Sequence, residues 1–241
     1  MIEVQTTSIS SFLRRFTAFC NLNRRRRDLE LLGNTDPEIL SRWYAALESL
    51  TAFYPQGWEC ELVARALADP YFPLSKLRKL NAEEFATEPG LVNLPQQCLA
   101  GMVAEHLLKW AEIFLSIREE LEQFSENGLV SDLRLPVSPQ EVFAETGWCE
   151  HCGGCCEIRG GPAEFTASFE LPGNWQLYFR GDGCKSQRFC PFLFEYFATD
   201  RYFCSIYRIK PKCCWEFDRE ECEFLQNDVA RERASHLSRE A

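Results

Sequence analysis

Four cysteines lie within the stretch CEHCGGCC, which runs from Cys149 to Cys156. Thiolates two or three residues apart can bind one metal ion, because a tight turn points both sulfur atoms to the same side. Gly153 and Gly154 allow the positive φ angles that such a turn needs. Four thiols on one short loop seldom complete a tetrahedral site, so we expect further ligands from elsewhere in the chain.

A disulfide knot and a dithiol redox relay are the other uses of closely spaced cysteines. Residues 1–20 do not resemble an export signal, because Arg14 and Arg15 interrupt their apolar residues. We therefore expect a cytoplasmic chain, in which thiols stay reduced and clustered cysteines are more often metal ligands. A redox relay needs an exposed thiol with a low pKa, and no feature of the sequence marks one.

Three later segments add thiols in a characteristic order. They are Cys190-Pro-Phe-Leu, Cys204-Ser-Ile-Tyr and Lys210-Pro-Lys-Cys-Cys. With CEHCGGCC before them, they resemble the CxxCxxCC (YkgJ-like) cysteine-cluster family, which is described as a zinc- or iron-chelating domain. Members of that family follow a CxxCGxCC element with CPFL, CxIY and RPxxC elements. The resemblance covers roughly residues 147–218.

The resemblance implies a shared pool of metal ligands: Cys149, Cys152, Cys155, Cys156, Cys190, Cys204 and Cys214. Cys214 belongs to this pool rather than Cys213, because it has the family's spacing from Tyr207. Lys210 stands where the family usually has arginine. Three cysteines are additional to the family pattern: Cys184, Cys213 and Cys222.

The ligand pattern favours an iron–sulfur cluster, with zinc as the alternative. A C-x2-C-x2-C run followed by a remote Cys-Pro is how bacterial ferredoxins hold a [4Fe–4S] cluster. Cys149, Cys152 and Cys155 with Cys190-Pro191 have this arrangement. The chain has 3 histidines, which points to sulfur ligands throughout, and we expect His151 to face solvent. Among longer relatives, the flagellin lysine methylases have a similar module that is associated with an iron–sulfur cluster.

Three classes of function remain open. They are a redox or methyl-transfer enzyme like the longer relatives, a zinc-stapled structural or interaction protein, and a metal-delivery or assembly factor. The sequence contains no G-x-S-x-G, Walker or H-E-x-x-H motif, so the catalytic residues, if any, are unknown. The partner is an unknown protein or small molecule. A net charge of −10 argues against nucleic acid, and no apolar run is long enough to span a membrane.

The distribution of cysteines predicts how the chain is organised. Of the 13 cysteines, all but Cys20, Cys60 and Cys98 lie between residues 149 and 222. We expect a mainly α fold, with a helical domain at 1–128, a linker at 129–147, and a small α+β cysteine-rich metal-binding module at 148–241. We interpret the three early cysteines as small buried hydrophobic residues.

Apolar periodicity and capping residues predict the individual elements. Helices are expected at 37–53, at 57–69, after Pro73, between Pro95 and Gly128, and at 216–237. Segments 189–197 and 202–207 are expected to form a hairpin. His106 falls on the apolar face of the long helix, which indicates a core histidine. Residues 24–27, four consecutive arginines, are expected to be a solvated helix end.

Overall fold

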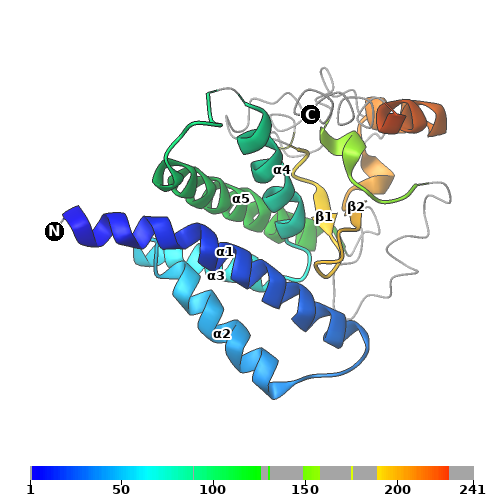
Figure 1. Cartoon of the computed structure of the whole chain (residues 1–241). Coiled ribbons are helices and arrows are strands. Elements are labelled where there is room, and N and C mark those ends of the chain that lie inside the picture. The colour runs from blue at the N-terminus through cyan, green and yellow to red at the C-terminus, as the bar shows by residue number, and fades with distance from the viewer. Residues whose placement is uncertain are drawn as a thin grey trace. The chain divides into compact units, whose positions relative to one another are not determined.

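The structure is a computed structural model that describes residues 2–88, 90–125, 130, 149–157, 175 and 189–227. Its helices are α1 (Ile2–Leu31), α2 (Pro37–Thr51), α3 (Gly57–Ala68), α4 (Leu74–Thr87), α5 (Gln96–Ser125) and α8 (Lys212–Glu216). Single 3₁₀ turns are η1 (Gly154–Glu157) and η2 (Tyr207–Ile209), and the strands are β1 (Leu193–Glu195) and β2 (Tyr202–Cys204). Figure 1 shows these elements. The predicted mainly helical fold with a small sheet is confirmed.

The chain divides into two compact units. The first comprises Met1–Glu120 and Phe194–Arg201, and the second comprises Leu121–Leu193 and Tyr202–Ala241. The predicted domain limits stay a prediction, since all of the linker except residue 130 lies outside the described residues. None of the described helices is both long and apolar enough to cross a membrane.

Local signals explain where the first helices begin and end. Gly33, with φ 68°, donates its N–H to the carbonyl of Glu30, and Asn34 donates to Leu29, which together end α1 in a Schellman motif. Asp36 caps α2, because its carboxylate accepts the N–H groups of Glu38 and Ile39 at 2.9 and 3.3 Å. The antiparallel neighbours α1 and α2 lie side by side (Figure 1).

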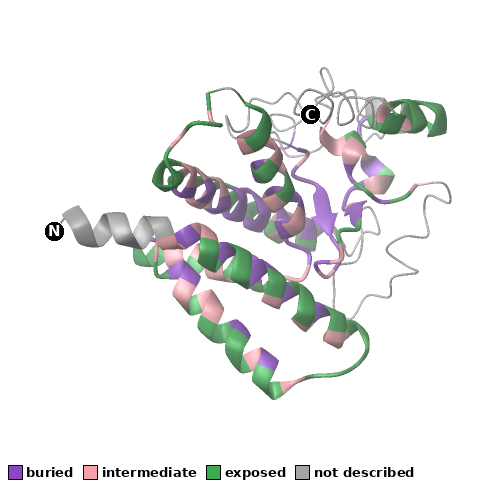
Figure 2. Ribbon diagram, in the orientation of Figure 1, coloured by how far each residue is buried: buried purple, intermediate pink, exposed green. Residues whose placement is uncertain are grey.

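The long predicted helix is present as α5, and its apolar face is buried, as Figure 2 shows in purple. The buried side chains on it include Val103, Leu107, Trp110, Phe114 and Ile117. In the first unit, the ring of Phe114 packs 5.2 Å from that of Phe72 and 5.0 Å from that of Phe194. Burial of each such side chain stabilises the fold by about 1.5–3 kcal/mol.

Segment 194–201 is held in the first unit by backbone and side-chain hydrogen bonds. Glu195 donates its N–H to the carbonyl of Tyr71, and Phe197 donates to Pro70, both at 3.0 Å. The Glu195 carboxyl in turn accepts the N–H of Ser75 at 2.8 Å, near the start of α4. This remote cap satisfies one of the backbone donors that a helix leaves open in its first turn.

The predicted hairpin is confirmed, since β1 and β2 pair in a two-stranded sheet. The predicted last helix, 216–237, is interrupted near its start. Helix α8 ends at Glu216, two non-helical residues follow, and residues 219–227 are helical. The remainder of the predicted helix lies outside the described residues.

The arginine run is only partly a solvated helix end, because Arg24 and Arg25 are exposed, whereas Arg26 is half-buried and Arg27 is buried. The guanidinium of Arg26 lies 3.9 Å from the centre of the Trp43 ring and pairs with Glu30 at 2.9 Å. Arg27 is buried, and its guanidinium donates to Glu30 and to the carbonyl of Ala68. Three of the four guanidiniums therefore have partners within the first unit, since Arg24 pairs with Asp200 at 3.2 Å.

Candidate metal centre

The CEHCGGCC stretch forms a tight loop in which backbone amides donate to sulfur atoms. We call residues 149–157 the knuckle loop. The N–H of His151 lies 3.3 Å from Sγ of Cys149, and the N–H of Gly154 lies 3.5 Å from Sγ of Cys152. Amide donors at this position stabilise the thiolate form of cysteine, which is the form that binds metals.

Positive φ angles shape the knuckle loop, as predicted, but at one unexpected position. Gly153 has φ 70°, which confirms its predicted role, whereas the second positive φ, 56°, belongs to His151 rather than Gly154. A Cβ atom at Gly153 would lie 3.0 Å from Cδ2 of Leu193 and 3.3 Å from the Tyr202 ring. Glycine is required there both by the backbone angle and by the close approach.

His151 does not face solvent, and that expectation is wrong. The side chain is 8% exposed, and its Nδ1 lies 3.1 Å from the carbonyl oxygen of Tyr202. The N–H of Tyr202 donates back to the carbonyl of His151 at 2.7 Å. His151 therefore attaches the knuckle loop to β2.

Cys190 is hydrogen-bonded to the knuckle loop, and Cys204 is the last residue of β2. Cys190 donates its N–H to the carbonyl of Cys156 at 2.8 Å. Ser205, next to Cys204, donates its N–H to the carbonyl of Phe192 at 2.9 Å. Burial raises the pKa of Cys190, and the charges of Cys204, Cys214 and Cys155 raise it further. These thiols are thus close enough to act on one another electrostatically.

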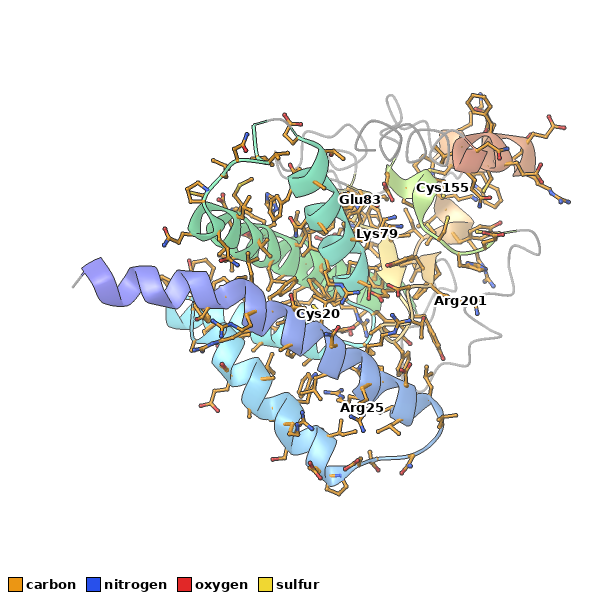
Figure 3. The ribbon with its side chains drawn as sticks, viewed as in Figure 1. Cys20, Arg25, Lys79, Glu83, Cys155 and Arg201 are labelled. Carbon is orange, nitrogen blue, oxygen red and sulfur yellow. The ribbon has the colours of Figure 1, made fainter. Side chains whose placement is uncertain are left out.

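Cys155 is a thiol of the knuckle loop with a lowered pKa. It lies on η1 (Figure 3). Its side chain is exposed. A hydrogen bond from the Cys156 thiol lowers the pKa of Cys155 to about 7, and the charge of Lys210 adds to this effect. The sequence did not indicate this thiol.

Lys210 is held between two aromatic rings beside this thiol. Its ammonium nitrogen lies 4.1 Å from the centre of the Tyr207 ring and 4.5 Å from that of the Trp215 ring. Cation–π attraction on both sides fixes the position of the charge. Lys210 thus supplies a fixed cation close to this thiol.

The described thiols are not arranged around a common point. None of the described cysteines is in a disulfide. Within the described ranges, no group of three or more His, Cys, Asp or Glu side chains has an arrangement that could hold a metal ion. The donor chemistry suits zinc or an iron–sulfur cluster, whereas the side-chain directions do not yet form the coordination sphere of either.

The early cysteines differ from one another in burial. Cys20 on α1 is buried, as predicted, and burial raises its pKa to about 12. Cys60 is half-buried, and Cys98 is exposed, so the interpretation of Cys98 as a buried hydrophobic residue is wrong. His106 is half-buried, and its Nδ1 lies 2.7 Å from Oδ1 of Asn81, which agrees with a satisfied structural histidine.

Of the additional cysteines, Cys222 is the one whose surroundings are described. Burial raises the pKa of Cys222, and the thiolate charges of Cys152, Cys149 and Cys155 raise it further. The family pattern does not include Cys222, and only its place among the other cysteines of the sequence could have signalled it. Cys184 and the side chain of Cys213 lie outside the described residues.

Comparisons of the chain with family models, with curated proteins and with solved structures found no match to any of them.

Proposed function

We propose that the chain is a metal-binding protein whose cysteines between residues 149 and 214 hold an iron–sulfur cluster, most simply a [4Fe–4S] cluster. The observation that carries the proposal is the approach of thiols from separate segments. Cys190 is bonded through its backbone to Cys156 and lies within electrostatic reach of Cys204 and Cys214. These segments are far apart in sequence, and each contributes a thiol, which is a soft metal ligand.

The hydrogen bonds of the knuckle loop also support a metal function. Amides donate to Sγ of Cys149 and Cys152, and hydrogen bonds of this kind tune the potential of iron–sulfur centres. Lys210 supplies a positive charge, which offsets part of the negative charge that several thiolates would concentrate there. Because the described thiols are not arranged around a common point, metal binding requires their side chains to rotate towards the metal. The ligand pool is the one that the sequence resemblance implies.

The choice of iron over zinc rests on ligand spacing. Cys149, Cys152, Cys155 and the remote Cys190-Pro191 have the order found in bacterial ferredoxins. A redox or methyl-transfer role and a cytoplasmic location extend this proposal and have no separate support in the described residues.

Anaerobic purification followed by a visible spectrum and by analysis of iron, zinc and acid-labile sulfide tests the proposal. We expect a brown protein with broad absorption near ~400 nm and with iron and sulfide in equal amounts. A colourless protein with stoichiometric zinc would show that the site is a zinc site instead. A protein without either metal would refute the metal-binding function itself.

Substitutions assign the metal to these cysteines. Cys190→Ser is expected to lose metal, because serine is a poor ligand for soft metals. Cys60→Ser is the matched control, since Cys60 lies on α3 in the first unit and is half-buried like Cys190. Equal metal content in the two variants would show that the ligand assignment is wrong.

A further inference from the structure

The solvent-facing side of α1 carries arginines at positions that share one side of the helix. Arg14, Asn21, Arg24 and Arg25 are all exposed. Asn21 lies seven residues after Arg14, and Arg24 and Arg25 lie three and four residues after Asn21. These are the spacings at which side chains of an α-helix are neighbours on one face. The two inner members of the run 24–27 pack within the first unit, so its two outer members remain for contacts from outside.

Two other segments of the first unit bring further cations to this side of α1. The guanidinium of Arg78, on α4, lies 3.4 Å from Oδ1 of Asn21, and the next residue, Lys79, is exposed. The carboxylate of Asp200 lies 3.2 Å from the guanidinium of Arg24, and the next residue, Arg201, is exposed. Cations from three segments that are far apart in sequence therefore lie around one part of α1.

We call these cations the basic band, which comprises Arg14, Arg24, Arg25, Arg78, Lys79 and Arg201. Figure 3 labels one cation from each of the three segments: Arg25, Lys79 and Arg201. The acidic residues beside the band are Asp28, Glu83 and Asp200. The cations outnumber them, so the band is positively charged, although the whole chain has a formal net charge of −10.

All members of the basic band except Lys79 are arginines. A guanidinium presents its N–H groups in a planar fork that can bind both oxygens of one carboxylate. Contacts with Asp200 and Asn21 already hold two of these side chains, Arg24 and Arg78, in place. Side chains that are ordered before binding lose less conformational entropy when a partner binds. The chemistry of the band therefore suits carboxylates.

We propose that the basic band is the docking surface for an Asp- and Glu-rich segment of a partner protein. A short acidic segment can satisfy the band without extending over the acidic remainder of the surface. Duplex nucleic acid fits less well, because its phosphates continue at about one charge per 1.7 Å and would meet that acidic surface. The exposed side chains of α1 between residues 14 and 28 include no aromatic ring on which the bases of a single strand could stack. The inference concerns the first unit and is independent of the proposed metal-binding function.

Fluorescence anisotropy of a fluorescein-labelled oligo-glutamate peptide, titrated with the full chain, tests the inference. We expect binding at low salt that weakens as salt is added, because the Debye length falls from about 30 Å at 0.01 M to about 8 Å at 0.15 M. Arg25→Glu and Lys79→Glu should each weaken binding by about 3- to 10-fold, since repulsion replaces attraction. Lys109→Glu is the matched control, because it makes the same charge change at an exposed position of α5 and should bind like the native chain.

Three results would overturn the inference. They are no binding of the peptide by the native chain, native affinity in both band variants, and an equal loss of affinity in Lys109→Glu, which would mean that only the net charge matters. The band variants lie on two different helices, so a folding defect in one does not remove the comparison. A labelled oligothymidylate is the competing probe. If it bound at least as tightly as the peptide and lost affinity in the same variants, the band would be a nucleic-acid surface instead.

Discussion

Glu195 is a completely buried carboxyl group in the first unit. Its oxygens accept the N–H groups of Ser75 at 2.8 Å and Asp200 at 3.3 Å. Burial raises its pKa from 4.5 to about 7, because desolvation disfavours the charged form more than these hydrogen bonds favour it. The charge state of one side chain therefore links the stability of the first unit to pH.

We expect the free energy of unfolding to decrease as the pH rises from 4.5 to about 7. In this window the folded protein keeps the proton on Glu195, whereas the unfolded chain has released it. The stabilisation by the protonated Glu195 is fully present below pH 4.5 and is lost above about pH 7. A shift of this size corresponds to about 3 kcal/mol. Urea unfolding at a series of pH values measures it.

Glu195→Gln is the matched variant, because glutamine is neutral and can still accept the N–H of Ser75. The free energy of unfolding of the native protein minus that of the variant should decrease as the pH rises from 4.5 to about 7. Burial also raises the pKa of Asp69 and lowers the pKa of His106. Both residues are present in both proteins, so their effect on the pH dependence cancels in this difference. A difference that does not vary with pH would contradict the prediction.

Among the elements, the knuckle loop depends most on its backbone conformation. Gly153 combines φ 70° with the close approach of Leu193, so Gly153→Ala meets both backbone strain and a steric clash. We expect this variant to be destabilised by about 1–2 kcal/mol from the backbone angle and by about 1–3 kcal/mol from overpacking. Urea unfolding measures the loss, and metal content shows whether the loop still binds.

Gly33→Ala separates the two causes. Gly33 has nearly the same angle, φ 68°, but no atom lies within 4 Å of a Cβ atom placed there. We expect only the backbone cost in this variant, with native metal content. An equal decrease in the free energy of unfolding in both alanine variants would mean that the close approach of Leu193 does not destabilise Gly153→Ala.

On the scale of the whole molecule, each of the two units has buried apolar residues of its own. The first has an extensive apolar core, which includes Phe19, Trp43, Leu50 and Trp110. The described core of the second unit includes Trp175, whose ring lies 4.7 Å from that of Phe192. A metal bound by cysteines of this unit would add its binding free energy to the stability of the unit.

We expect metal removal to affect the two units unequally. After treatment of the full chain with a chelator and a reductant, most of the far-UV helical signal should remain, because α1–α4 need no metal ligand. Limited proteolysis should accelerate within residues 149–227, where the thiols would have lost their common centre. Circular dichroism and mass spectrometry of the fragments measure these effects. Collapse of the helical signal would contradict this division.

The sequence by itself determined helices α2 to α5 and the hairpin. The Asp36-Pro37 signal predicted the start of α2, and Pro70 predicted the end of α3 within two residues. The positive φ at Gly153 was also predictable. Capping, periodicity and glycine angles act over a few residues, so a local pattern is enough to specify them.

Only the tertiary structure decided which distant groups meet. It placed Arg27 on the carbonyl of Ala68, Glu195 on the N–H of Ser75, and His151 against Tyr202. It also placed Gln226 on the Glu150 carboxylate of the knuckle loop, which no local pattern indicated. Each of these side chains is polar, and whether it meets solvent or a buried partner depends on how segments far apart in the sequence pack together.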